Sequence, residues 1–279
     1  MSVLIKSSRP TVMQLPSPAG NNYNEEWTIK LQAGLTYHAI EFETNLKQVG
    51  TIKNITLDIG GTPIVSITNT MLDLLDKMYK RFQKEGRFVL DFSKFDYRTA
   101  SGIYQTQLVT LLTDDVTLKI EFADKGSNDP DRPTMKAKAY VTDTDEFGRI
   151  FKPTRYQLNQ ITAAEGTHVW TLNNTGMNKF IQRMVFDERE VKIAQIKIKR
   201  GSKVIETLTR NDIEFALQRH RNVALQTGFL LLDFTLFGFG SNGAITTAGL
   251  GFEFEVDGPG AIKTYIEGFD QIGQLPQPS

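Results

Sequence analysis

The chain of 279 residues has no cysteine, no net charge and no long apolar run. Without cysteine it cannot form disulfides, thiolate metal sites or cysteine nucleophiles, and the absence suits folding in a reducing cytosol. Lys and Arg number 32, as do Asp and Glu, so the basic excess of a dedicated nucleic-acid-binding protein is missing. No run approaches the roughly 18 apolar residues of a membrane span, and the first residues lack the apolar core of a secretory signal. We expect a water-soluble protein, made in the cytosol, that does not bind nucleic acid directly.

Residues typical of enzyme sites are also scarce. His38, His168 and His220 are widely separated, and none has an acidic residue at the spacing of a catalytic triad or a metal site. The run 238–243 fits the GxGxxG pattern, but the residues after it do not predict a helix that could hold a pyrophosphate. We therefore expect no catalytic residues and no bound nucleotide cofactor, and interpret 238–243 as a loop between strands.

The most informative feature that is present is an internal repeat. Ile52–Gly60 returns as Ile193–Gly201, and the offset 193−52 is 141. Gly86 returns as Gly228, where the offset 228−86 is 142. The tryptophans Trp27 and Trp170 align as a third pair, with an offset 170−27 of 143. Such a period is far longer than that of a solenoid, so we expect two similar domains in tandem.

Short runs in both halves alternate apolar and polar residues, as in Val116–Phe122 and Phe252–Val256, which is typical of antiparallel strands with one buried face. The repeated strand has the same irregularity in both copies. Its apolar residues step by three and then by two, at Ile52/Ile55/Leu57 and at Ile193/Ile196/Ile198. One extra residue absorbed inside a strand is what a β-bulge produces, so the pattern predicts a bulge in each copy.

One helix is expected in each half, between strands. In the first half an apolar stripe from Met71 to Phe82 has helical spacing, with Thr70 and Asp73 as a capping pair and Gly86 as the stop. In the second half Asn211 and Glu214 align as the capping pair, and Gly228 aligns as the stop.

The fold class expected from these patterns is all-β. We place an extended, Pro-rich arm at 1–25, the first β domain at 26–155, the second at 156–268 and a tail at 269–279.

This organisation resembles the double jelly-roll major capsid proteins of tailless, membrane-containing double-stranded DNA bacteriophages, and most closely the corticovirus coat protein. The resemblance spans most of 27–256 and is found in Ala33–Tyr37, Thr51–Asn54, Asp58–Gly61, Asn69–Leu75, Ile196–Lys199 and the helix near Asn211. It implies two tandem eight-stranded jelly-roll sandwiches, each with one helix inserted between strands. It also implies a structural protein of the virion, without enzyme activity, whose homotrimers form pseudo-hexagonal capsomers that tile an icosahedral shell.

The implied partners are neighbouring capsomers, minor capsid or penton proteins and, through the N-terminal arm with Lys6 and Arg9, the internal viral membrane. Members of the family bind calcium, so acidic loop residues are candidate ligands for a structural calcium ion: Asp124, Asn128, Asp129 and Asp131. Their spacing does not match a calcium-loop motif, and solvated loop charge is the favoured interpretation.

Two other classes of function fit the same β-rich pattern. A carbohydrate-binding or glycan-processing β-sandwich would need exposed aromatic residues on a concave face or a suitably spaced carboxylate pair. A phage vertex or spike component would use the same kind of fold in another oligomeric state.

Overall fold

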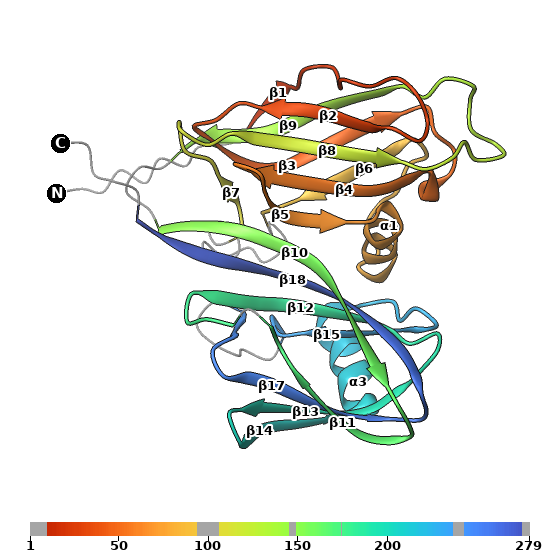
Figure 1. The fold of residues 1–279 in the computed structure, drawn as a ribbon, viewed down its shortest axis with the longest axis vertical. Coiled ribbons are helices and arrows are strands. Elements are labelled where there is room, and N and C mark those ends of the chain that lie inside the picture. Colours follow the sequence, from red (N-terminus) through yellow and green to blue (C-terminus); the bar gives the residue numbers. More distant parts are fainter. Residues whose placement is uncertain (1–9, 94–105, 145–148, 174, 237–242, 275–279) are drawn as a thin grey trace. The chain divides into compact units, whose positions relative to one another are not determined.

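The computed structural model describes residues 10–93, 106–144, 149–173, 175–236 and 243–274, and these form two compact units (Figure 1). The first unit takes its described residues from Met1–Leu72, Gln83–Lys152 and Gly273–Ser279. The second takes them from Asp73–Phe82 and Pro153–Ile272. Residues 73–82 thus belong to the first half of the sequence but to the second unit.

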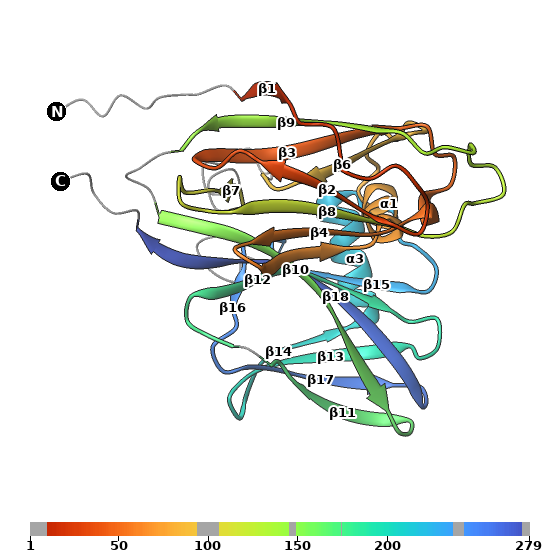
Figure 2. The same ribbon diagram turned by 45° about the horizontal axis from the view of Figure 1, so that its top comes forward.

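The first unit is a sandwich of two antiparallel sheets (Figure 2). One sheet has the order β2 (Glu26–Leu31), β8 (Val116–Phe122), β4 (Ile52–Ile59) and β5 (Thr62–Ile67). The other has the order β1 (Thr11–Gln14), β9 (Met135–Asp143), β3 (Leu35–Thr44) and β6 (Arg87–Asp91), with β7 (Leu108–Val109) also paired to β3. Apolar side chains from both inner faces fill the core, among them Ile29, Ile40, Phe42, Leu57, Leu90 and Ile120.

The second unit repeats this arrangement strand for strand. Its first sheet has the order β11 (Gly166–Thr171), β17 (Leu250–Val256), β13 (Ile193–Arg200) and β14 (Lys203–Thr209). Its second has the order β10 (Arg149–Thr162), β18 (Gly260–Gln274), β12 (Lys179–Asp187) and β15 (Phe229–Asp233), with β16 (Ile245–Thr246) also paired to β12. Identical strand order in two sandwiches is the structural counterpart of the sequence repeat.

The predicted bulges are confirmed, and they coincide in the two halves. The register between β4 and β8 shifts between Ile52 and Asn54, and the register between β13 and β17 shifts between Ile193 and Gln195. A second shared shift lies between Tyr37 and Ala39 in β3 and between Ile181 and Arg183 in β12.

The alignment of the two tryptophans is wrong by two residues. Trp27 on β2 pairs with Ile120 on β8, and Ile120 pairs on its other side with Ile55 on β4. Ile196 occupies the place of Ile55 in the second unit, and it faces Phe254, which is paired with His168. Trp27 therefore corresponds to His168, at the same offset that separates Ile52 from Ile193. A shift of two residues keeps the same face of a strand, so side-chain alternation could not reveal the error.

The two expected helices are α1 (Asn69–Met78) and α3 (Arg210–Arg221), but each is capped two residues earlier than predicted. Thr68 accepts a hydrogen bond from the backbone N–H of Met71 at 3.2 Å. Thr209 and Asp212 form a capping box at the equivalent place. Asp73 and Glu214, the predicted capping acids, instead pair with Lys77 and Arg210 one turn away.

The helix stops also differ from the prediction. The left-handed residues that follow the helices are Lys80 (φ 52) and Asn222 (φ 53). Gly86 and Gly228 have positive φ as well, but they lie in the turns that lead into β6 and β15. At Gly86 an added Cβ would lie 2.4 Å from the carbonyl oxygen of Thr44, so this turn requires glycine.

Both ends of the chain contain more strand than expected. Part of the expected arm 1–25 forms β1, whose four residues pair in register with β9 from Thr11↔Val141 to Gln14↔Lys138. Part of the expected tail 269–279 continues β18 as far as Gln274. That the two duplicated domains span residues 26–155 and 156–268 stays a prediction. Among the described residues, no helix is long and apolar enough to cross a bilayer.

Candidate functional site

The calcium candidates lie in one loop, and each of its acidic side chains has its own hydrogen-bond or ion-pair partners. Asp129 is buried, and its carboxylate accepts backbone N–H groups of Lys47 at 2.6 Å, Gln48 at 3.1 Å and Gly126 at 3.2 Å, together with the hydroxyl of Thr51. Burial raises the pKa of Asp129, but these donors outweigh it and the pKa lies below its usual value. Asp129 thus organises the loop.

The other acidic candidates have different partners. Asp124 accepts from the side-chain amide of Asn24 at 2.5 Å, and Asp131 pairs with Lys125 at 2.5 Å. In the part of the chain that the structure describes, no group of three or more His, Asp or Glu side chains is arranged to hold a metal ion. Asp124, Asn128, Asp129 and Asp131 stay candidates for calcium, and loop charge without a metal stays the favoured interpretation.

The histidines occupy three unlike environments. His38 is buried at the register shift of β3, where its Nδ1 lies 2.7 Å from Ser93 Oγ and its Nε2 lies 2.9 Å from Thr142 Oγ1. Burial lowers its pKa from 6.5 to about 4, so the ring is neutral at physiological pH. His168 lies on β11, with Nε2 2.8 Å from the carbonyl oxygen of Ala164, and His220 is exposed on α3. Residues 238–242 of the GxGxxG run lie outside the described residues, as do Lys6 and Arg9.

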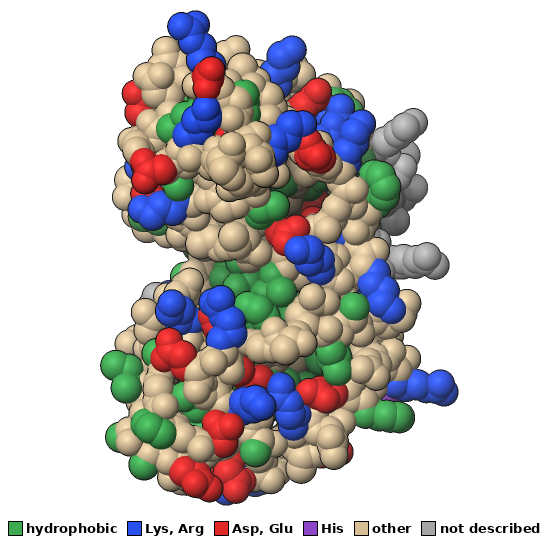
Figure 3. Space-filling model, turned by 90° about the vertical axis from the view of Figure 1, so that its right-hand side faces the viewer, with side chains coloured by type: hydrophobic (Ala, Val, Ile, Leu, Met, Phe, Trp, Pro, Cys, Tyr) green, Lys and Arg blue, Asp and Glu red, His purple; other side chains and the backbone are tan. Residues whose placement is uncertain are grey.

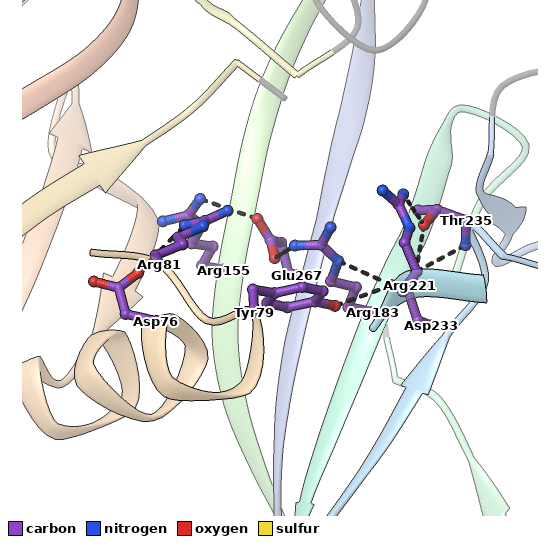
Figure 4. Close-up of polar contacts among 9 residues, drawn as sticks. All are labelled: Asp76, Tyr79, Arg81, Arg155, Arg183, Arg221, Asp233, Thr235 and Glu267. Carbon is purple, nitrogen blue, oxygen red and sulfur yellow. Dashed lines mark hydrogen bonds and ion pairs between the residues drawn. The ribbon is translucent and has the colours of Figure 1, made fainter. Parts of the chain in front are cut away.

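A ladder of buried charges crosses one sheet of the second unit (Figure 4). It contains Asp233 on β15, Arg183 on β12, Glu267 on β18 and Arg155 on β10, in the order in which these strands lie side by side. We call these four residues the charge ladder. None of them is more than 4% exposed.

The charges in the ladder alternate in sign. Arg183 lies 3.5 Å from Asp233 on one side and 3.5 Å from Glu267 on the other, and Arg155 lies 3.0 Å from Glu267. Tyr79, in the turn that follows α1, donates to Asp233 at 2.9 Å, and its ring centroid lies 4.4 Å from Arg183 Cζ. Thr235, in the turn that follows β15, donates to Asp233 from both its N–H and its hydroxyl.

The ladder belongs to the second repeat alone. Arg183 directly follows the register shift of β12, and Ala39 directly follows the equivalent shift of β3, so Ala39 occupies the place of Arg183 in the first unit. Ala39 is paired with Tyr140 on β9, whereas Arg183 is paired with Glu267 on β18. Only the acid at the end of the strand is shared, as Asp91 and Asp233. A slip of one residue in any of these strands would separate the pairs and leave buried charges without their partners, which is costly. The charge ladder was not predicted from the sequence, although single charged residues inside otherwise apolar strands indicate buried ion pairs.

Apolar side chains are exposed on edge strands of both units. Val12 on β1 is 61% exposed, Val169 on β11 is 71% exposed and Val204 on β14 is 43% exposed. An edge strand presents unpaired backbone groups and readily accepts another strand. Exposed apolar residues on such edges are candidates for contacts between protein chains.

The chain is similar to viral coat proteins in sequence and in fold. The profile of the viral coat protein P2 N-terminal domain matches residues 12–142, and that of the viral coat protein P2 C-terminal domain matches residues 152–272. No curated protein sequence matches.

Solved structures of viral capsid proteins have the same fold. The major capsid protein P2 from bacteriophage PM2 is similar with a TM-score of 0.81 and 15% identity, over 96% of this chain and 100% of that one. A chain of Sulfolobus turreted icosahedral virus is similar with a TM-score of 0.67 and 10% identity, over 96% and 92% of the two chains. A chain of the PBCV-1 virus capsid is similar with a TM-score of 0.62 and 10% identity, over 96% and 95%. The matched profiles and the double jelly-roll fold agree, and this chain belongs to the viral coat protein P2 family, whose members are major capsid proteins: structural components of the virion rather than enzymes.

Proposed function

We propose that three copies of this capsid protein associate into a pseudo-hexagonal capsomer and that such capsomers tile an icosahedral shell. The observation that supports this most directly is the repetition of one strand order and one set of register shifts in both units. A threefold assembly of a doubled domain presents six similar faces to its neighbours. One surface chemistry can then meet neighbours in nearly six directions.

The proposed partners are the other two copies in the trimer, neighbouring capsomers, and minor capsid or penton proteins at the vertices. The arm that precedes β1, which carries Lys6 and Arg9, is proposed to lie against a neighbouring copy or against the internal viral membrane. Direct contact with nucleic acid is not part of the proposal, because the net charge is zero. On the face shown in Figure 3, basic and acidic side chains are interspersed in each unit.

Sedimentation velocity of the purified chain tests the trimer. We expect a species of three times 31.4 kDa that persists on dilution, because subunits of a stable coat share large interfaces. A monomer that binds glycan on an array would support the carbohydrate-binding alternative, and a pentamer would support the vertex alternative; either result would overturn the proposal. Electron microscopy of the same sample should show particles with a six-sided outline and threefold symmetry.

A further inference from the structure

Strands β2 and β11 are equivalent edges of equivalent sheets. Each is the last strand of its sheet and pairs on its inner side with one strand only, β8 or β17. Because Trp27 corresponds to His168, the next residue of each strand corresponds too, so Thr28 matches Val169. The backbone N–H and C=O of Thr28 bond to Ala19 on the outer side of β2, so the matching register directs the N–H and C=O of Val169 to the outer side of β11.

In the first unit the chain itself covers this outer side. Ala19 and Thr28 exchange two backbone hydrogen bonds, of 2.8 and 3.0 Å, in an antiparallel bridge. The neighbouring Asn22 carbonyl accepts a hydrogen bond from Trp27 Nε1 at 3.0 Å, and Trp27 is only 3% exposed. An extended segment of the arm thus pairs with the edge of β2.

In the second unit the connection between β10 and β11 is too short to cover the edge of β11. β10 ends at Thr162 and β11 begins at Gly166, so only three residues join them, too few to run back along the edge. Val169 is 71% exposed, Thr167 and Thr171 are exposed, and no described residue bonds to the Val169 backbone on its outer side. The edge of β11 is open within the described chain.

Two features beside this edge indicate what fits there. Beside the exposed Val169 lies a hollow of about 270 Å³, which is also lined by Thr171, the buried Leu172, Lys199 and the side-chain-free Gly249 and Gly251. At the other end of the strand Glu165 and Glu255 are exposed, and Glu255 faces Thr167 across the pair β11–β17. An extended segment with apolar residues first and basic residues after them, running antiparallel to β11, would match both features.

We propose that residues 1–9 of a second copy of this chain add to β11 as an antiparallel strand. Val3, Leu4 and Ile5 would lie toward the hollow, with Lys6 and Arg9 toward Glu165 and Glu255. These nine residues lie outside the described structure, and only Pro10 separates them from β1, which pairs with β9. Extended, they span about 30 Å. The end of the chain is a poorer occupant, because Pro276 and Pro278 have no N–H to donate. This inference rests on the proposed assembly, which brings copies side by side.

Because the chain has no cysteine, a designed disulfide tests the contact without background. One copy receives Leu4→Cys and a differently tagged copy receives Val169→Cys; the two are co-expressed and mildly oxidised. Val3→Cys and Ile5→Cys replace Leu4→Cys in parallel samples, so that side chains on both faces of the added strand are covered. The matched control moves the second cysteine to Val204, an exposed valine on β14 at the other edge of the same sheet.

With Val169→Cys we expect non-reducing electrophoresis to show a disulfide-linked band of two chains that carries both tags. With Val204→Cys we expect this band to be absent. Equal bands for the two, or none, would overturn the inference. So would a double variant, Leu4→Cys with Val169→Cys in one chain, that closes a disulfide within a single copy. Sedimentation of the same samples separates this inference from the proposed function: trimers without the disulfide contradict only the docking of residues 1–9, whereas a sample without trimers contradicts the proposed capsomer.

Discussion

The hydroxyl of Tyr79 lies 2.9 Å from Oδ2 of Asp233 and donates a hydrogen bond to it within the second unit. Asp233 is fully buried, and its other oxygen accepts from the N–H and hydroxyl of Thr235. Residues 154 positions apart in the sequence thus share one carboxylate. The turn after α1 is thereby joined to the end of β15.

Tyr79→Phe should destabilise the second unit by about 1–3 kcal/mol, because it leaves a buried carboxylate oxygen with one donor fewer while it preserves the ring beside Arg183. Urea denaturation followed by tryptophan fluorescence measures the change. The control is Tyr23→Phe, which removes a hydrogen bond to the Pro130 carbonyl in a half-buried loop and should cost less. Equal losses of unfolding free energy for the two variants would contradict the claim that the hydrogen bond from Tyr79 to the buried Asp233 stabilises the second unit.

Glu267→Gln should cost about 3–5 kcal/mol, because it leaves Arg155 and Arg183 buried without the carboxylate between them. Calorimetry should show the second unit unfolding at a clearly lower temperature. The control is Glu253→Gln, which removes a carboxylate paired with Lys197 and Lys199, and we expect little change there. Similar melting temperatures for the two variants would mean that the ladder does not hold the sheet.

His38 should make the first unit less stable in weak acid. Burial lowers its pKa from 6.5 to about 4 in the folded chain, so between these values the unfolded chain binds a proton that the folded chain does not. The free energy of unfolding therefore falls as pH drops from 6.5 toward 4, by an amount on the order of 3 kcal/mol. Denaturation at a series of pH values measures this slope.

The repeat itself suggests the variant that removes the slope. Gln182 lies between Ile181 and Arg183, at the register shift that His38 occupies in the first unit. His38→Gln should flatten the dependence between pH 6.5 and 4, because glutamine does not titrate; His220→Gln on the exposed face of α3 is the matched substitution for comparison. A slope that survives His38→Gln would assign the acid sensitivity to another group.

The repeat, the bulges and the two helices could be predicted from the sequence because each depends on local spacing. Ile52/Ile55/Leu57 and Ile193/Ile196/Ile198 record the bulge directly in their steps. The charge ladder could not be predicted, because Arg183 meets Asp233 and Glu267 only when strands distant in sequence lie side by side. The placement of residues 73–82 in the second unit escaped prediction for the same reason, since no local pattern records such a contact.

The arm segment that covers β2 gives the last prediction. Gly20 has φ 139, and an added Cβ would lie 2.3 Å from the Trp27 ring, so Gly20→Ala should push the arm off this ring. The cost should be about 2 kcal/mol or more, and Trp27 emission should shift to the red as the ring becomes exposed. Measured in a Trp170→Phe background, the signal comes from Trp27 alone, since the chain has two tryptophans.

The matched control for Gly20→Ala is Gly60→Ala in the turn between β4 and β5. Gly60 also has positive φ, 58, but an added Cβ meets nothing within 4 Å, so only backbone strain of about 1 kcal/mol is introduced. Trp27 emission should stay unchanged in this variant because the arm keeps its contact. If Gly20→Ala also left the emission unchanged, the arm would not be what shields Trp27, and the comparison between a covered β2 edge and an open β11 edge would lose its foundation.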